Sequence, residues 1–97
     1  MPSQNDVMRY YQEKISHIES QIRELDRHVA ELDAFERREM SRNLPYEYKI
    51  NLHSAVSKAK NDAQAVKGKA IAAANNLKSR VHAFMQNPKN VSNPNRD

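Results

Sequence analysis

The chain has 97 residues, of which 38% are hydrophobic and 29% are charged. It therefore forms at most one small domain, and a single copy cannot bury a large core. It contains no cysteine, which excludes disulfides, thiolate metal sites and a thiol nucleophile. The N-terminal residues show no apolar signal-peptide core and no run approaches the length of a membrane span, so we expect a soluble, cytoplasmic protein.

Charge is distributed unevenly along the chain. The net charge is +4, but residues 1–42 carry nine acidic and seven basic side chains, whereas residues 43–97 carry nine basic and three acidic ones. The basic half favours a polyanionic partner, either nucleic acid or an anionic membrane. A helix that lies on a membrane needs bulky apolar residues, and this half offers mainly alanine. We therefore predict no membrane partner.

Apolar residues from Met8 to Leu32 recur at alternating steps of three and four, which is the heptad pattern of a coiled-coil seam. The pattern predicts a helix over about residues 5–42, roughly 55 Å long at 1.5 Å per residue. Its seam consists of Met8, Tyr11, Ile15, Ile18, Ile22, Leu25, Val29 and Leu32. The seam fades at Glu36, where an apolar residue is due, although Phe35 can cover its edge.

Pro45 is the one interior break. It disfavours helix at Leu44 and suits the first turn of a following helix, and no further proline occurs before Pro88. We therefore predict a second helix over about residues 46–86. Its apolar residues also recur at helical spacing, but the middle of the stripe is nearly all alanine, so a neighbouring helix can approach closely. The stripe consists of Leu52, Val56, Ala59, Ala63, Val66, Ala70, Ala73, Leu77, Val81 and Phe84.

Two long helices with a short connection predict an all-α fold, a long antiparallel helical hairpin over residues 1–92 with a disordered tail at 93–97. Because one hairpin buries little, we expect two copies to dimerise into a four-helix bundle. A monomeric hairpin and a parallel coiled coil are the alternatives. The residues predicted for the core or the dimer contact are Ile15, Ile18, Ile22, Leu25, Val29, Leu32, Val56, Val66 and Leu77.

Groups suited to catalysis are scarce. Asp62 is the only acid between Glu47 and Asp97, so the second helix has no carboxylate pair for general acid–base chemistry. No glycine-rich phosphate loop or nucleophile elbow is present. The histidines lack the Glu-x-x-His spacing of metal sites in helical bundles, which favours surface positions for His17, His28, His53 and His82. We predict that the protein is not an enzyme and uses no cofactor or metal.

The second predicted helix carries its cations in two rows, one on each flank of the face opposite its apolar stripe. The first cationic row consists of Lys58, Lys69 and Arg80, with Asn51 and Asn76 on the same line. The second cationic row consists of Lys49, Lys60, Lys67 and Lys78, with His53 close by. A spacing of eleven residues is three helical turns, so each row runs nearly straight along the helix.

Between the two rows lies an uncharged face, the neutral strip, which consists of Ser54, Ser57, Asn61, Gln64, Ala65, Gly68, Ala72, Asn75 and Ser79. An ordinary solvated face mixes long side chains of both signs. The strip instead predicts a low, backbone-lined surface, from whose edges lysines reach phosphates. Gly68 is the only glycine, and glycine inside a helix costs about 1 kcal/mol relative to alanine. We therefore take it as the candidate point of closest approach to a ligand. The alternative is that the lysines simply make an alanine-rich helix soluble.

A straight helix of nearly 60 Å can lie across a duplex and touch successive phosphate rows. No aromatic residue lies between the cationic rows, so base stacking with a single strand is poorly served. The shallow minor groove of A-form RNA suits this shape best. We predict sequence-independent binding of double-stranded RNA that weakens with added salt. The predicted contacts are Asn51, Lys58, Lys60, Lys67, Gly68, Lys69, Asn76 and Arg80. The alternative function is a coiled-coil interaction or assembly protein, an adaptor or chaperone, without a nucleic-acid role.

Two segments of the second helix resemble the small RNA-silencing suppressor of insect nodaviruses. The segment "NLHSAVSKAK" (51–60) is similar to that family's Asn-Leu-His followed by Lys-Ala-Lys. The segment "SRVHAFMQNPKNV" (79–91) is similar to a later one, in which Ser-Arg precedes two bulky apolar residues and a proline closely followed by valine. The two segments lie further apart here than in the family, and the first helix is longer.

The resemblance implies an all-helical antiparallel homodimer that forms a four-helix bundle and binds one face of double-stranded RNA. Such a protein shields duplex RNA from Dicer and sequesters small interfering RNA, so the resemblance implies a viral suppressor of RNA silencing that acts in the host cytoplasm. A Dicer-type host nuclease is a further candidate partner. The resemblance implicates Asn51, Lys58 and Arg80 in RNA contact, whereas Lys69 is included only by its place in the first cationic row.

Overall fold

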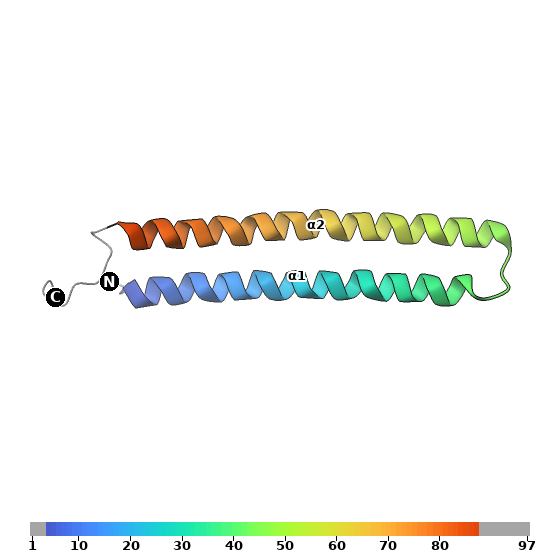
Figure 1. Cartoon of the computed structure of the whole chain (residues 1–97), viewed down its shortest axis with the longest axis horizontal. Helices are drawn as coiled ribbons and strands as arrows, with labels where there is room; N and C mark the ends of the chain where they lie inside the picture. Colours follow the sequence, from blue (N-terminus) through green and yellow to red (C-terminus); the bar gives the residue numbers. More distant parts are fainter. Residues whose placement is uncertain (1–3, 88–97) are drawn as a thin grey trace, which may run out of the picture.

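The computed structural model describes residues 4–87, which form two helices, α1 (Gln4–Met40) and α2 (Tyr46–Gln86). The helices lie side by side and run in opposite directions, joined at one end of a rod (Figure 1). The prediction of an all-α antiparallel helical hairpin is therefore confirmed. The observed α1 starts one residue earlier and ends two residues earlier than expected, and α2 has the expected bounds. The tail expected at 93–97 lies outside the described residues.

The connection between the helices is short and is closed by local hydrogen bonds. The backbone N–H of Ser41 donates to the carbonyl of Arg37 at 3.2 Å, and its hydroxyl donates to the carbonyl of Arg38 at 2.7 Å. Pro45 then takes an extended conformation, with φ −55° and ψ 143°, and precedes the first residue of α2. Its carbonyl accepts from the N–H of Lys49 at 3.1 Å, which begins the helical pattern. Proline suits this place because it has no N–H to leave without a partner.

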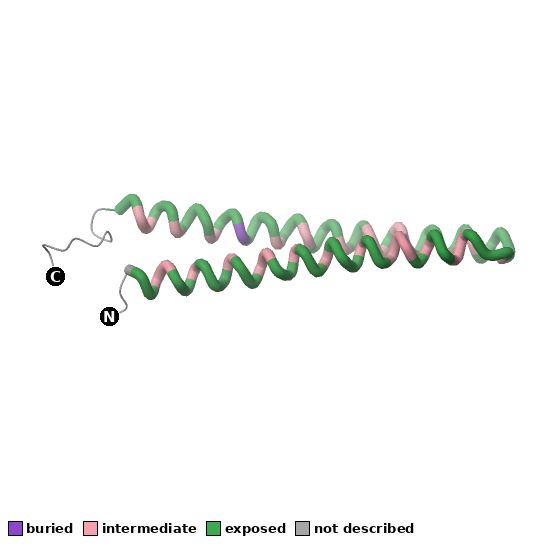
Figure 2. Tube along the Cα trace, turned by 60° about the horizontal axis from the view of Figure 1, so that its bottom comes forward, coloured by how far each residue is buried: buried purple, intermediate pink, exposed green. Residues whose placement is uncertain are grey.

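The side of α1 that faces α2 follows the predicted seam. Each seam residue from Met8 to Leu32 is half-buried, and the half-buried positions of both helices turn toward the other helix (Figure 2). The seam continues beyond Leu32 with two acids at the positions due for apolar residues. The side chains of Glu36 and Glu39 are only 17% and 18% exposed. Phe35 remains 40% exposed, so it does not close the edge of the seam.

The stripe of α2 agrees with its predicted positions except at Val66 and Ala73. Among the described residues only Val56 and Ala74 are buried, at 4% and 3% exposure. Val66 is 53% exposed, and Ala73 is exposed as well. Lys67 and Ala74, the next residue in each case, face α1 instead. Val66 therefore does not belong to the core of the single hairpin, because alanines left the centre of the stripe undefined, and its predicted place in a dimer contact stays a prediction.

The other residues predicted for the core lie between the helices. Val56 is buried, and those that are half-buried are Ile15, Ile18, Ile22, Leu25, Val29, Leu32 and Leu77. Half-burial is what two helices alone can provide, because each helix has only one neighbour. Whether these residues also contact a second copy stays a prediction.

Candidate nucleic-acid interface

The first cationic row lies on the exposed side of α2. Lys58, Lys69 and Arg80 are all exposed and follow one another at intervals of about 16 Å. Within residues 4–87, Lys58 and Lys69 have no ion-pair partner. Arg80 donates from Nε to the side-chain oxygen of Asn76 at 3.4 Å, which joins two members of the same line. This row therefore presents its charges to solvent.

The second cationic row is turned toward α1, and two of its lysines form short ion pairs there. Lys60 Nζ lies 2.6 Å from Asp33 Oδ1. Lys67 Nζ lies 2.7 Å from Asp26 Oδ1, and the Lys67 side chain is only 28% exposed. Both lysines were predicted to contact RNA, whereas the structure gives each of them a carboxylate partner within the same chain.

Two further contacts continue this line toward the two ends of the rod. Lys78 Nζ donates to Glu19 Oε2 at 3.3 Å, near the chain termini. At the connection, His53 Nδ1 lies 2.6 Å from the half-buried Glu36 Oε1. We call the four contacts the ion-pair ladder. Its members are Glu19–Lys78, Asp26–Lys67, Asp33–Lys60 and Glu36–His53.

The neutral strip is open to solvent. All its members are exposed except Ser57, which is half-buried. A Cβ added to Gly68 meets nothing within 4 Å, and the glycine does not have a positive φ. The hairpin itself therefore gives no reason for glycine at this position.

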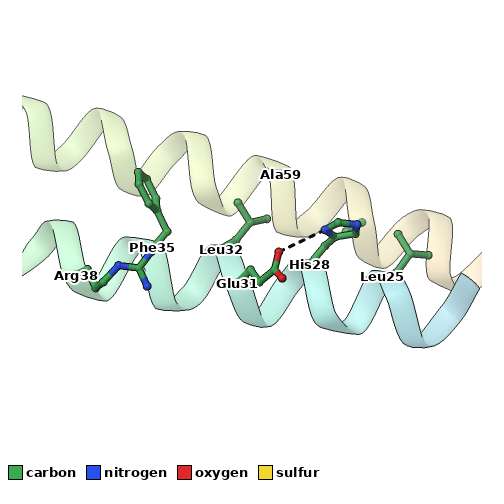
Figure 3. Close-up of a pocket in the computed structure, with 8 residues that line it drawn as sticks. Leu25, His28, Glu31, Leu32, Phe35, Arg38 and Ala59 are labelled. Carbon is green, nitrogen blue, oxygen red and sulfur yellow. Dashed lines mark ion pairs between the residues drawn. The ribbon is translucent and has the colours of Figure 1, made fainter.

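An apolar groove runs along the flank of the hairpin opposite the ion-pair ladder. Its larger part has a volume of about 690 Å³, and a neighbouring hollow of about 350 Å³ shares Leu25 and His28 with it. Leu32 and Phe35 of α1 point toward α2 around Ala59, while His28 and Glu31 lie at the edge (Figure 3). Val66 and Ala70 line the second hollow. Small side chains on α2 and large ones on α1 thus leave a shallow apolar surface that no part of residues 4–87 covers.

One stretch of the outward face of α1, around Arg27, neutralises its own charges. Arg27 donates to Glu24, three residues before it, and to Glu31 at 2.5 Å, four residues after it. The hydrogen bond from Arg27 lowers the pKa of the Glu24 carboxyl. His28 adds further contacts, 3.5 Å to Glu24 and 3.7 Å to Glu31. The unbalanced positive charge therefore lies on α2.

The structure brings together Asn51, Lys58, Lys69, Asn76 and Arg80 on one exposed side of α2, with Gly68 beside them on the neutral strip. It separates them from Lys60 and Lys67, which are part of the ladder. Sequence reasoning missed the ladder acids. Their signal is the seven-residue spacing of Glu19, Asp26 and Asp33, which keeps them on one edge of a heptad seam.

The described part of the chain contains no cluster of metal-ligating side chains, and neither of its helices is long and apolar enough to cross a bilayer. No family model matches the chain, and neither the curated proteins nor the solved structures include a match.

Proposed function

We propose that the protein binds double-stranded RNA, without regard to sequence, through the exposed side of α2. The observation that carries this proposal is the first cationic row. Three cations, at positions 58, 69 and 80, lie in line over about 33 Å beside an uncharged strip, and the two lysines among them have no partner in residues 4–87. Charges left free in this way are available to phosphates.

The chemistry of the neutral strip supports RNA over other polyanions. Asn61, Asn75 and Ser79 are exposed and can exchange hydrogen bonds with 2′-hydroxyl groups, which line the wide minor groove of A-form RNA. None of them carries a long side chain that would hold the helix away from a duplex. Because phosphates and hydroxyls are the same at each step, such contacts are independent of sequence.

We also propose, from the resemblance of residues 51–60 and 79–91, that this binding suppresses RNA silencing in the cytoplasm of an infected host cell. A protein lying along a duplex would shield it from Dicer and withhold small interfering RNA from the silencing machinery. A direct contact with a Dicer-type nuclease is a further part of this proposal.

We propose that two copies associate through the apolar groove. Phe35 is 40% and Val66 is 53% exposed there, and Leu25 and Leu32 are half-buried. A second hairpin would cover these side chains and complete the core that one hairpin lacks. Light scattering should give twice the chain mass, and Val66→Glu should lower it to the mass of one chain because it places a charge in the contact. An unchanged mass for Val66→Glu would contradict this choice of face.

The RNA proposal is tested by gel shift with three matched ligands, an RNA duplex of about 25 base pairs, the same DNA duplex and one of the RNA strands. We expect the RNA duplex to bind most tightly, with an affinity that falls as salt is added. The variant Lys58→Ala/Lys69→Ala/Arg80→Ala should lose binding while circular dichroism shows unchanged helix. Equal affinity for all three ligands, or none for the RNA duplex, would overturn the proposal.

The apolar groove also supports the second candidate function, an interaction or assembly protein that receives a partner helix. In that case the groove variant Phe35→Glu would abolish partner binding, and the triple variant of the first cationic row would be without effect. The two variants therefore separate the candidates, because Phe35 of α1 lines the groove and the first cationic row lies on the exposed side of α2.

A further inference from the structure

We infer that the two cationic rows of α2 have separate tasks: the first cationic row contacts phosphates, and Lys60 and Lys67 position it by holding α2 against α1. This inference rests on the proposed function and corrects its contact set. The ladder lysines become positioning residues, and the RNA lies off the centre of the neutral strip, toward Lys58, Lys69 and Arg80.

The distances support the positioning task. Lys60 and Lys67 lie 2.6 and 2.7 Å from their carboxylate partners, Asp33 and Asp26. An ion pair adds no net charge to the surface, and its carboxylate competes with a phosphate for the N–H donors of the lysine. Lys58 and Lys69 have no such competitor among the described residues.

The location of the two ion pairs also supports the positioning task of Lys60 and Lys67. Between Val56 and Leu77 the side of α2 that faces α1 holds only small side chains and the two ladder lysines, Lys60 and Lys67. Alanines can pack at several rotations of a helix about its axis, because none of them needs a particular hole. The ion pairs act in the one part of the hairpin where apolar packing does least to fix the rotation of α2.

The geometry of an α-helix fixes the direction of one cationic row relative to the other. Successive residues are about 100° apart around an α-helix, so residues two apart point in nearly opposite directions. Lys58 and Lys69 each lie two residues from a ladder lysine, Lys60 and Lys67 respectively. Turning Lys60 and Lys67 toward the acids of α1 therefore turns Lys58 and Lys69 away from them, out to solvent.

The test removes one lysine from each row together with one acid of α1, so that the net charge is unchanged. The ladder variant is Asp26→Asn/Lys67→Gln, and the matched variant is Glu13→Gln/Lys69→Gln, which also loses one acid and one lysine. Glu13 is exposed and far along the other helix. Affinity for the RNA duplex is measured over a range of salt concentrations, with circular dichroism confirming that each variant is helical.

We expect the ladder variant to bind the duplex about threefold more weakly than wild type, because α2 is held less firmly in its orientation, but with the same dependence of log affinity on log salt, because no phosphate contact is lost. The Lys69 variant should bind about tenfold more weakly, with a salt slope lower by about one. A charge-exchanged variant, Asp26→Lys/Lys67→Asp, restores the pair in reverse and should return the affinity to that of wild type.

An equal fall in the salt slope of the Lys67 and Lys69 variants, with both folded, would show that Lys67 contacts RNA and would overturn the inference while the proposed function stands. Wild-type affinity in the ladder variant would overturn the positioning role in the same way. Loss of affinity in the charge-exchanged variant would have the same meaning. If the wild-type protein fails to bind the duplex, the proposed function and this inference fail together.

Discussion

The two helices of the hairpin are similar in length but meet each other with different side chains. From Met8 to Leu32, α1 presents a regular seam of large apolar residues, all half-buried. In the middle of α2 the facing side is built from alanines, together with Lys60 and Lys67, whose ammonium groups reach acids of α1.

This difference shows how each helix is oriented about its own axis. A large side chain such as Ile22 loses contact if its helix rotates, so the seam of α1 fixes that helix by packing. Alanine has little to lose on rotation. In α2 the orientation therefore depends on Val56 and Leu77 toward the ends of the stripe and on the ion-pair ladder between them.

The neighbours Ala73 and Ala74 give the most direct check on this orientation. Ala74 is 3% exposed against α1, whereas Ala73 is exposed. Ala74→Leu should lower the free energy of unfolding by about 2 kcal/mol, because a larger side chain overpacks a filled site. Ala73→Leu should change it by less than about 0.5 kcal/mol. Urea unfolding followed by circular dichroism measures both. The opposite ranking would mean that α2 has the orientation expected from its sequence.

Two valines of α2 provide a second comparison, with a smaller effect. Val56 is 4% exposed and Val66 is 53% exposed. Val56→Ala should cost about 1.5 kcal/mol, because it removes buried methyl groups. At protein concentrations low enough to keep the hairpin monomeric, Val66→Ala should be neutral or stabilise by up to about 0.5 kcal/mol, since alanine is the better helix former; in the proposed dimer it should cost more, because a second copy covers Val66. A cost for Val66→Ala as large as that for Val56→Ala would show that a second copy covers the groove. Unfolding at two protein concentrations would then show a shifted midpoint.

The comparisons of the two alanines and of the two valines also show which parts of the structure could be predicted from the sequence. The heptad steps of α1 and the break at Pro45 were sufficient for the hairpin and its helix bounds, because bulky apolar spacing and proline act locally. At Val66 and Ala73, the residue of α2 that faces α1 was predicted one position too early. The orientation of α2 there depends on acids such as Asp26, more than forty residues away in the sequence, whose pairing only the antiparallel arrangement reveals.

The candidate site was predicted in part for the same reason. Lys58, Lys69 and Arg80 were found on one line, and the structure leaves them exposed. Helical spacing alone could not distinguish them from Lys60 and Lys67, because both rows flank the same face of one helix. The distinction comes from the acids on α1 that stand beside one row and not the other.

Substitutions at Gly68 test the exposed side of α2, which does not pack against α1 and is proposed to bind RNA. Gly68→Ala should raise the free energy of unfolding by about 0.8 kcal/mol, because alanine favours the helix and its Cβ meets open space. Duplex affinity should be unchanged in this variant. Gly68→Leu should remain folded but bind the RNA duplex more weakly, because a large side chain would hold the backbone away from it. Unaltered binding by Gly68→Leu would remove Gly68 from the contact surface.

The smallest predicted effect concerns one pair of the ladder, Asp33 and Lys60, whose side chains are each 35% exposed. Ion pairs this open to solvent are screened, so a double-mutant cycle with Asp33→Asn and Lys60→Gln should give a coupling of only about 0.5 kcal/mol, lower still at high salt. The pair therefore contributes little to stability, yet a small bias is sufficient to choose between orientations that alanines pack almost equally well. A comparison cycle on Glu39 of α1 and Arg42 of the connection, paired at 2.9 Å, should give a similar coupling. The two cycles should differ in one respect: only the loss of Lys60 and Asp33 should alter the amide signals of α2 around Ala63 and Ala70 in an NMR spectrum. If neither cycle disturbs those signals, the ladder does not set the rotation of α2, and packing alone must do so.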